Sequence, residues 1–297
     1  MWTLFGLPSC AGLRQPSPWV LKVELAMKYL EIDHSSQQPQ ILRIPSSTPT
    51  GKVPCLVMED GPLCESDRIL RTIEERCPHR NYPHPADEDH ALGTAFVRLV
   101  EDHLFFIISK TKHLDPVGSK EMWEQMLSKQ PGFLKWLVRK GVQKMMKARL
   151  DSTSLGGLRD EEVYEEAYKD IEALSAQLSK GGFIASESLS IYDFSVAAHI
   201  ASIFYWRIDN WLTPLFKENQ IFQAYLERVA KSVGGFEFEV LAPIENSTLS
   251  ISGAQAAPAV REIDKVRSER AIMIAQPHNP LVITVNIGAT GTYLGTG

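Results

Sequence analysis

Ser17 and Cys10, near the N-terminus, carry side chains that could act on a thiol. Ser17 precedes Pro18, and this pair is typical of a helix start, because serine caps free amides and proline is tolerated at the first helical position. A helix start favours negative charge, so the Ser17 hydroxyl could stabilise a thiolate or could only cap its helix. Cys10 lies earlier, among turn formers, and could exchange with a disulfide or be an incidental thiol.

A second group of candidate residues surrounds a predicted hairpin. Gly51-Lys52-Val53-Pro54 leads into a strand over residues 53–59, Asp60-Gly61 is a hairpin turn, and Glu65-Ser66 follows the returning strand. Ser66 is a good cap for the next helix, and Glu65 beside it could simply favour the helix dipole. Lys52 could pair with a carboxylate or remain a solvated loop lysine.

The apolar pattern predicts the elements that position these residues. Residues 2–5 are expected to form a strand, followed by a helix to about residue 31, an irregular segment, the hairpin and a helix that ends at Cys77-Pro78. After a proline-containing linker, the pattern is purely helical. The sequence therefore predicts an α/β domain over residues 1–80, a linker over 81–89, an all-helical domain over 90–235, and a largely disordered tail over 236–297.

Within the helical domain, Ser190-Ile191-Tyr192-Asp193 predicts a capping box at a helix start. Ser190 can bond the amide of Asp193, and Asp193 can return a bond to the amide of Ser190. Leu189 and Phe194 are spaced for a hydrophobic staple across the same turn. This motif is therefore interpreted as structural rather than chemical.

The charge and composition of the chain argue against several classes of function. The net charge of −5 argues against nucleic acid as a partner, since phosphate binding needs a clustered basic surface. The one basic stretch, Lys135 to Arg149, is interrupted by apolar residues at helical spacing and is interpreted as a solvated helix face. No signal peptide or membrane-spanning segment is expected, and the four unpaired cysteines fit a reducing, cytoplasmic location. No metal is expected, although His79, His84 and His90 cluster near the linker with Asp87 and Asp89.

The order of elements and these motifs resemble the glutathione S-transferase superfamily. In that superfamily the N-terminal domain is thioredoxin-like, the proline corresponding to Pro54 is cis, and its neighbour offers backbone groups to glutathione. The resemblance implies that Lys52, Val53, Pro54, Glu65 and Ser66 bind glutathione as co-substrate, with Glu65-Ser66 at its γ-glutamyl end. The Ser190–Asp193 motif looks like the capping box of the superfamily's helical domain.

Two further segments look like the branch related to failed axon connections and metaxin. Arg98 to Phe106 resembles the first long helix of that branch's helical domain, and Ser17-Pro18-Trp19 through Lys22 resembles the start of its first helix. The resemblance covers about residues 1–233, and nothing in the tail matches. Relatives of the metaxin type act in protein import or interaction rather than in catalysis.

The function implied by the resemblance is conjugation of glutathione to a small apolar electrophile, as in detoxification, with Ser17 stabilising the thiolate. A possible homodimer is also implied. Two alternatives stay open, namely a non-catalytic glutathione-binding or adaptor protein, and thiol–disulfide exchange through Cys10. Four aromatic residues could line the electrophile pocket or belong to the core: Trp123, Trp136, Tyr164 and Tyr168.

Overall fold

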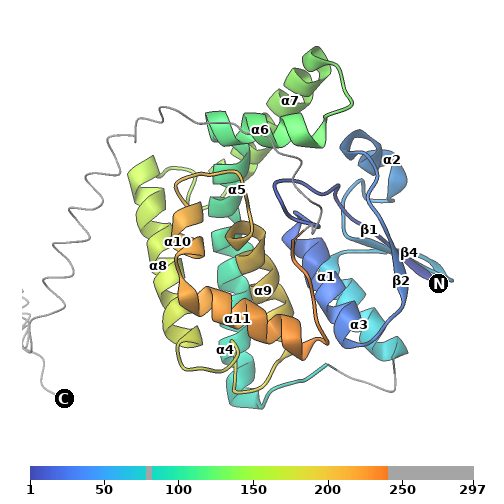
Figure 1. Cartoon of the computed structure of the whole chain (residues 1–297), viewed down its shortest axis with the longest axis vertical. Helices are drawn as coiled ribbons and strands as arrows, with labels where there is room; N and C mark the ends of the chain where they lie inside the picture. Colours follow the sequence, from blue (N-terminus) through green and yellow to red (C-terminus); the bar gives the residue numbers. More distant parts are fainter. Residues whose placement is uncertain (78–81, 240–297) are drawn as a thin grey trace, which may run out of the picture. The chain divides into compact units, whose positions relative to one another are not determined.

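The N-terminal part of the chain folds around a four-stranded sheet in the order β2–β1–β3–β4. β1 (Trp2–Phe5) runs parallel to β2 (His34–Gln37) and antiparallel to β3 (Cys55–Met58), which forms the predicted hairpin with β4 (Gly61–Cys64). The coordinates are a computed structural model that describes residues 1–77 and 82–239 (Figure 1). The arrangement is the thioredoxin-like α/β fold that the sequence predicts.

Two helices cover the sheet. α1 (Pro18–Tyr29) connects β1 to the parallel strand β2, and α3 (Ser66–Arg76) follows the hairpin and packs against α1 (Figure 1). The segment between β2 and β3 holds a single 3-10 turn (Ile41–Arg43) and the short helix α2 (Ile44–Ser47). Strand β2 was not predicted, because its sequence His-Ser-Ser-Gln has no apolar alternation and it forms a sheet edge.

The rest of the described chain is helical, as predicted. Residues 87–113 form three consecutive helical segments, because a π-helical stretch interrupts the α-helical bonding. The last helix of the described residues begins at a cap where the Asn219 side chain accepts a bond from the Ile221 amide. The segments are α4 (Asp87–Arg98), η2 (Leu99–Leu104), α5 (Phe105–His113), α6 (Pro116–Met126), α7 (Gly132–Asp151), α8 (Asp160–Leu178), α9 (Ile191–Phe204), α10 (Thr213–Lys217) and α11 (Gln220–Ser232).

The capping box predicted at the start of α9 is present. The Asp193 carboxylate accepts bonds from the Ser190 amide and hydroxyl at 2.8 and 2.7 Å, and also from the Ile184 amide and the Tyr225 hydroxyl, each at 2.8 Å. Leu189 and Phe194 are both buried, as the staple requires. The box therefore ties the loop before α9 and helix α11 to one buried carboxylate.

An ion pair joins the two predicted domains where α1 packs against α9. Lys22 on α1 donates to Glu101 on η2 at 2.8 Å, and both side chains are 4% exposed. Ser195 on α9 also donates to Glu101, and Asp67 on α3 accepts from Lys22. Each buried charge thus has more than one polar partner, as burial of charge demands.

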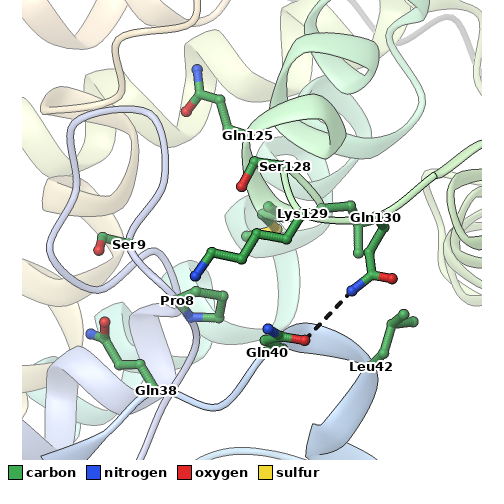
Figure 2. A pocket seen from close by; sticks show the side chains of 11 residues that line it. Pro8, Ser9, Gln38, Gln40, Leu42, Gln125, Ser128, Lys129 and Gln130 are labelled. Carbon is green, nitrogen blue, oxygen red and sulfur yellow. Dashed lines mark hydrogen bonds between the residues drawn. The ribbon is translucent and has the colours of Figure 1, made fainter. Parts of the chain in front are cut away.

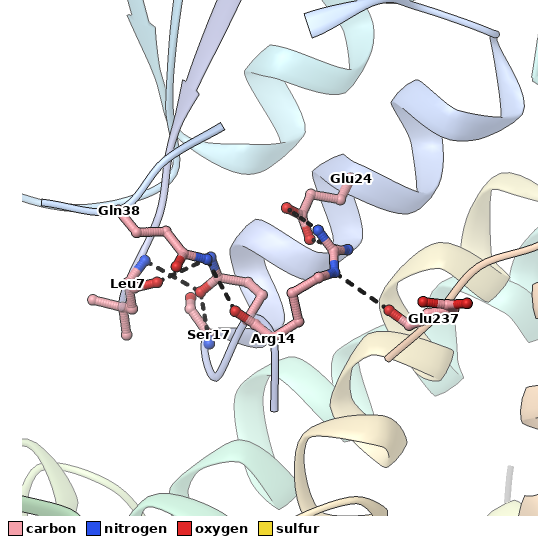
Figure 3. A network of polar contacts seen from close by, with 7 residues as sticks. Leu7, Arg14, Ser17, Glu24, Gln38 and Glu237 are labelled. Atoms are coloured by element: carbon pink, nitrogen blue, oxygen red, sulfur yellow. Dashed lines mark hydrogen bonds and ion pairs between the residues drawn. The ribbon is translucent and has the colours of Figure 1, made fainter. Parts of the chain in front are cut away.

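The last described residues pack on the N-terminal loop. Phe238 is buried and stacks on Tyr205 with a centroid distance of 5.4 Å, and its carbonyl accepts from the Arg14 amide. The Arg14 guanidinium also bonds the Glu237 carbonyl and pairs with Glu24 on α1 (Figure 3). Residues 236–239 of the predicted tail therefore belong to the folded body, and the remainder of that prediction, from residue 240, lies outside the described residues.

Candidate functional site

One end of the sheet brings the predicted site segments together. Phe5 at the end of β1 pairs with Cys55 at the start of β3, and Cys55 pairs with Cys64 at the end of β4. The segment that ends at Pro54 and the segment that begins at Glu65 therefore leave the sheet side by side. The loop from Gly6 that leads to Ser17 leaves β1 at the same end, which joins three separate stretches of sequence in one place.

The Val53–Pro54 peptide bond is cis, which confirms the sequence prediction. Pro54 is buried, Val53 is partly exposed, and Lys52 is exposed. The Lys52 carbonyl accepts a bond from the Thr48 hydroxyl at 2.9 Å, which anchors the residues before the proline. The exposed edge of this segment can offer main-chain groups to a ligand, whereas Lys52 makes no side-chain bond to another described residue.

Glu65 and Ser66 differ in detail from the sequence prediction. Helix α3 begins at Ser66, so the cap position falls on Glu65 rather than on Ser66. Glu65 has a φ of 74°, in the left-handed region that non-glycine residues rarely adopt. Such strained residues concentrate at binding sites. Glu65 is exposed and Ser66 buried at the start of α3, where amides and dipole favour an anionic group.

Ser17 occupies the cap position of α1, but its side chain makes no cap hydrogen bond. The side chain of Gln15 bridges the loop instead, because its Oε1 accepts from the Ser17 and Leu7 amides, both at 3.2 Å (Figure 3). Gln15 is itself buried, and a lone glutamine in a loop gave no sequence signal of this role. Ser17 is itself 6% exposed, and because its side chain does not cap α1, the structure does not support the purely capping interpretation.

Cys10 is poorly suited to thiol exchange. It is 4% exposed, and burial raises the pKa of its thiol to about 12, against the opposing charge of Lys112. Its sulfur lies 3.5 Å from Oε1 of Gln125, which also accepts from the Ala11 amide at 2.8 Å. A buried, protonated thiol attacks disulfides slowly, so the geometry favours the incidental interpretation of Cys10.

A cavity of about 250 Å³ opens beside this end of the sheet, between the loops after β1 and β2 and the end of α6. Figure 2 shows the side chain of Lys129 reaching across it toward Pro8, and Gln130 bonded to Gln40 at 3.5 Å. Ser17, Val53, Pro54, Glu65 and Ser66 do not line it. Most of the residues that line the cavity are polar, and none of them was predicted from the sequence as a site residue. The lining residues are Pro8, Ser9, Gln38, Gln40, Leu42, Gln125, Met126, Leu127, Ser128, Lys129 and Gln130.

The aromatic candidates divide between core and surface. Trp123 is buried in the core, and Tyr164 packs on Trp211 with a centroid distance of 5.3 Å. Trp136 is 56% exposed on α7. None of the four predicted aromatic residues lines the cavity beside the sheet.

The histidines near the linker have other partners. His84 lies 2.8 Å from Glu74, and His90 bonds Tyr192, while His79 lies outside the described residues. Within residues 1–77 and 82–239, no group of three or more metal-ligating side chains is close enough to hold an ion, and no helix has the length and apolar character needed to cross a membrane.

Comparison with known proteins identifies first a family for the N-terminal part of the chain and then a relative that covers more of it. The family described as glutathione S-transferase, N-terminal domain, matches residues 16–76. The isoprene-epoxide–glutathione S-transferase of Rhodococcus sp. (strain AD45) is 27% identical over 244 residues, covering 78% of this chain and 98% of that protein.

Solved structures share the fold at low identity. A beta-etherase from Sphingobium sp. strain SYK-6 has a TM-score of 0.54 at 16% identity, covering 89% of this chain and 99% of the other. A delta-class glutathione transferase of Nilaparvata lugens has a TM-score of 0.51, also at 16% identity, covering 79% and 91%. These structures show that the chain shares the fold of glutathione S-transferases, with a thioredoxin-like part followed by a helical part, and residues 16–76 match the N-terminal domain of that family.

Proposed function

We propose that the protein is a glutathione transferase that conjugates glutathione to a small electrophile. The observation that carries the proposal is the convergence of three segments at one end of the sheet. They are the cis-proline segment Lys52-Val53-Pro54, the strained turn at Glu65-Ser66, and the start of α1 at Ser17. No segment contributes more than part of a site, but together they offer main-chain groups, a carboxylate and a hydroxyl.

The proposed roles follow from the chemistry of the tripeptide. The Glu65 carboxylate would face the γ-glutamyl ammonium, and Ser66 with the first amides of α3 would face the adjoining carboxylate. The backbone at Val53 would hold the cysteinyl unit. The hydroxyl of Ser17, at the positive end of α1, would donate to the glutathione sulfur and favour its thiolate.

In the proposed reaction the glutathione thiolate attacks an electrophilic carbon of the second substrate. A carbon–sulfur bond forms while the bond to the leaving group, or one carbon–oxygen bond of an epoxide, breaks. The electrons of that bond leave with the departing group or remain on the epoxide oxygen, which then takes a proton. The hydroxyl of Ser17 stays intact throughout, because it stabilises the nucleophile and does not itself attack.

The cavity next to this end of the sheet is the proposed site of the electrophile. The relative from Rhodococcus is named for an epoxide substrate, which supports a small, uncharged reacting group. Lys129 and the cavity's amide side chains favour a substrate that also carries a polar or anionic group over the wholly apolar one expected from the resemblance. We also propose a cytoplasmic location and a homodimer, which light scattering would test.

Two measurements on the full chain test the proposal. The protein should bind immobilised glutathione and elute with the free tripeptide, and Glu65→Gln should weaken this retention. It should also conjugate glutathione to members of a panel that includes an aryl halide and an epoxide. Retention without any conjugation would favour the adaptor alternative, and loss of both would overturn the proposed site.

A further inference from the structure

Helix α7 exposes an unusual amount of apolar surface. Six large apolar side chains are exposed in the described part of the chain, and four of them lie on this helix. Phe133, Trp136, Leu137 and Met145 are 74%, 56%, 57% and 50% exposed. Large apolar groups gathered on one element of a folded protein typically mark an interaction surface.

Three of these side chains share one face of the helix. Phe133, Trp136 and Leu137 are spaced by three and four residues, which places them together at the N-terminal end of α7. Val138 and Val142, which are partly buried against the core, lie on the opposite face, and α7 packs against α5 and α6. Figure 1 shows α7 at one end of the helical domain. The apolar face is therefore left uncovered by the described chain.

The same helix is strongly basic in an acidic protein. α7 has six Lys or Arg residues and one Asp, a balance of +5, whereas the other residues have 25 basic and 35 acidic side chains, a balance of −10. Lys140 and Lys144 are exposed among the apolar residues of the outer face, and no described carboxylate pairs with either. Lys147 on this face pairs with Asp151.

We propose that α7 binds the surface of a membrane that contains anionic lipid. An exposed helix face that combines Phe, Trp and Leu with lysines suits the boundary between headgroups and acyl chains. The lysines complement the negative headgroups, and Trp136 suits the interface itself. A second copy of the chain is a poor occupant, because pairing two α7 helices would bring two charges of +5 together. In this arrangement the protein lies on the membrane through this one helix.

Co-sedimentation of the full chain with vesicles tests this inference. The protein should pellet with vesicles of phosphatidylcholine and phosphatidylserine and remain in solution with phosphatidylcholine alone. Binding should weaken as salt is raised toward about 150 mM, since the lysine contribution is screened. Removing two lysine charges with Lys140→Gln and Lys144→Gln should reduce binding by at least about 10-fold. Replacing Phe133, Trp136 and Leu137 with serine should abolish it.

Matched variants separate the surface from general effects. Lys28→Gln with Lys180→Gln removes two exposed lysines outside α7, one on α1 and one in the turn after α8, and Leu42→Ser removes an exposed apolar side chain outside α7. Neither should alter binding. All variants should keep the melting temperature of the parent, since the substituted side chains are exposed.

Three results would overturn the proposal. The first is a parent protein that stays in solution with phosphatidylserine vesicles even at low salt. The second is unchanged binding by the α7 variants. The third is a dimer that the serine substitutions dissociate, without vesicle binding, because the face would then hold a second copy. Glutathione retention is measured in parallel, so a failure here is distinguishable from a failure of the proposed enzymatic function.

Discussion

Ser17 illustrates how one hydroxyl can be separated from the helix that carries it. Since its side chain makes no cap hydrogen bond, Ser17→Ala should leave the melting temperature nearly unchanged. If the hydroxyl donates to the glutathione thiolate, the loss of one bond to a charged acceptor should slow conjugation by about one to two orders of magnitude. The pKa of bound glutathione should rise in parallel, which ultraviolet absorbance of the thiolate would measure.

Ser17→Thr retains a hydroxyl and should retain most of the conjugation rate. Cys10→Ser should leave that rate unchanged, because the buried Cys10 thiol stays protonated at neutral pH. A Ser17→Ala protein with normal conjugation, together with an inactive Cys10→Ser protein, would reverse the two assignments.

His199 should make the protein sensitive to acid. Burial lowers the pKa of His199 to about 3, although its Nδ1 bonds the Ser195 carbonyl at 2.8 Å. The unfolded chain, with an ordinary histidine pKa of about 6.5, binds this proton first, so stability falls as the pH drops below that value. The expected slope from this residue is about 1.4 kcal/mol per pH unit.

Urea unfolding at several pH values from neutral to about 4.5 measures that slope, because this pH range covers most of the interval between the two pKa values. His199→Gln should unfold at a lower urea concentration at neutral pH. Its unfolding free energy should also fall less steeply as the pH is lowered, by the contribution of one proton. Parallel curves for the parent and His199→Gln proteins would show that His199 is not the titrating group.

At the scale of elements, two capping boxes offer a direct comparison. Asp193 is fully buried and accepts four hydrogen bonds at the start of α9, whereas Glu162 closes an exposed box at the start of α8. Asp193→Ala should cost about 3 kcal/mol, since several buried donors lose their partner, and Glu162→Ala about 1 kcal/mol or less. Chemical denaturation measures both. Glutathione retention should change little, and its loss from a stable Asp193→Ala protein would move Asp193 into the site.

The ion pair between α1 and η2 is a second element-scale prediction. Glu101→Leu leaves Lys22 buried with only Asp67 as a charged partner, and Lys22→Met leaves Glu101 without a cation. Each single change should destabilise by about 3–5 kcal/mol, and the double variant should cost much less than their sum. Additive losses in the double-mutant cycle would show that the two charges do not stabilise each other.

At the scale of the whole molecule, the C-terminal boundary of the folded body can be tested by truncation. A chain that ends after Glu239 keeps Phe238 on Tyr205 and should melt at nearly the parent temperature. A chain that ends after Val233 loses this buried ring and the Arg14 contacts, at a cost of about 3 kcal/mol or more. Equal melting of the two chains would mean that residues 234–239 do not stabilise the body.

The sequence predicted what depends on local signals. The hairpin at Asp60-Gly61 and the box at Ser190 each rest on a few neighbouring residues, and both are present. The cis bond before Pro54 was implied by the family resemblance and is also present. Strand β2 was missed because it is a polar edge strand stabilised by β1. The π-helical stretch was missed because an apolar spacing does not reveal one extra residue in a turn.

The candidate site divides in the same way. The convergence of Pro54 and Glu65 at one sheet end follows from the hairpin, which the sequence shows. Gln15 acts through the shape of its loop, where it binds the Leu7 and Ser17 amides, and Lys129 lines a cavity formed by segments distant in the sequence, so residue type and spacing carry no signal of either role. The absence of a cap bond from the Ser17 side chain could not be anticipated either, because serine before proline is equally compatible with a working cap.

The pairing of Lys22 with Glu101 bears on how this protein could be recombined with its relatives. The two halves of the chain share one buried charge pair, so neither half is a self-contained module. A chimera that takes its first 77 residues from a relative with an apolar side chain at the position of Lys22 would inherit Glu101 as an unpaired buried carboxylate. A chimera joined at the linker should therefore fold only when Lys22, Glu101 and Ser195 all come from the same parent protein or are all replaced together.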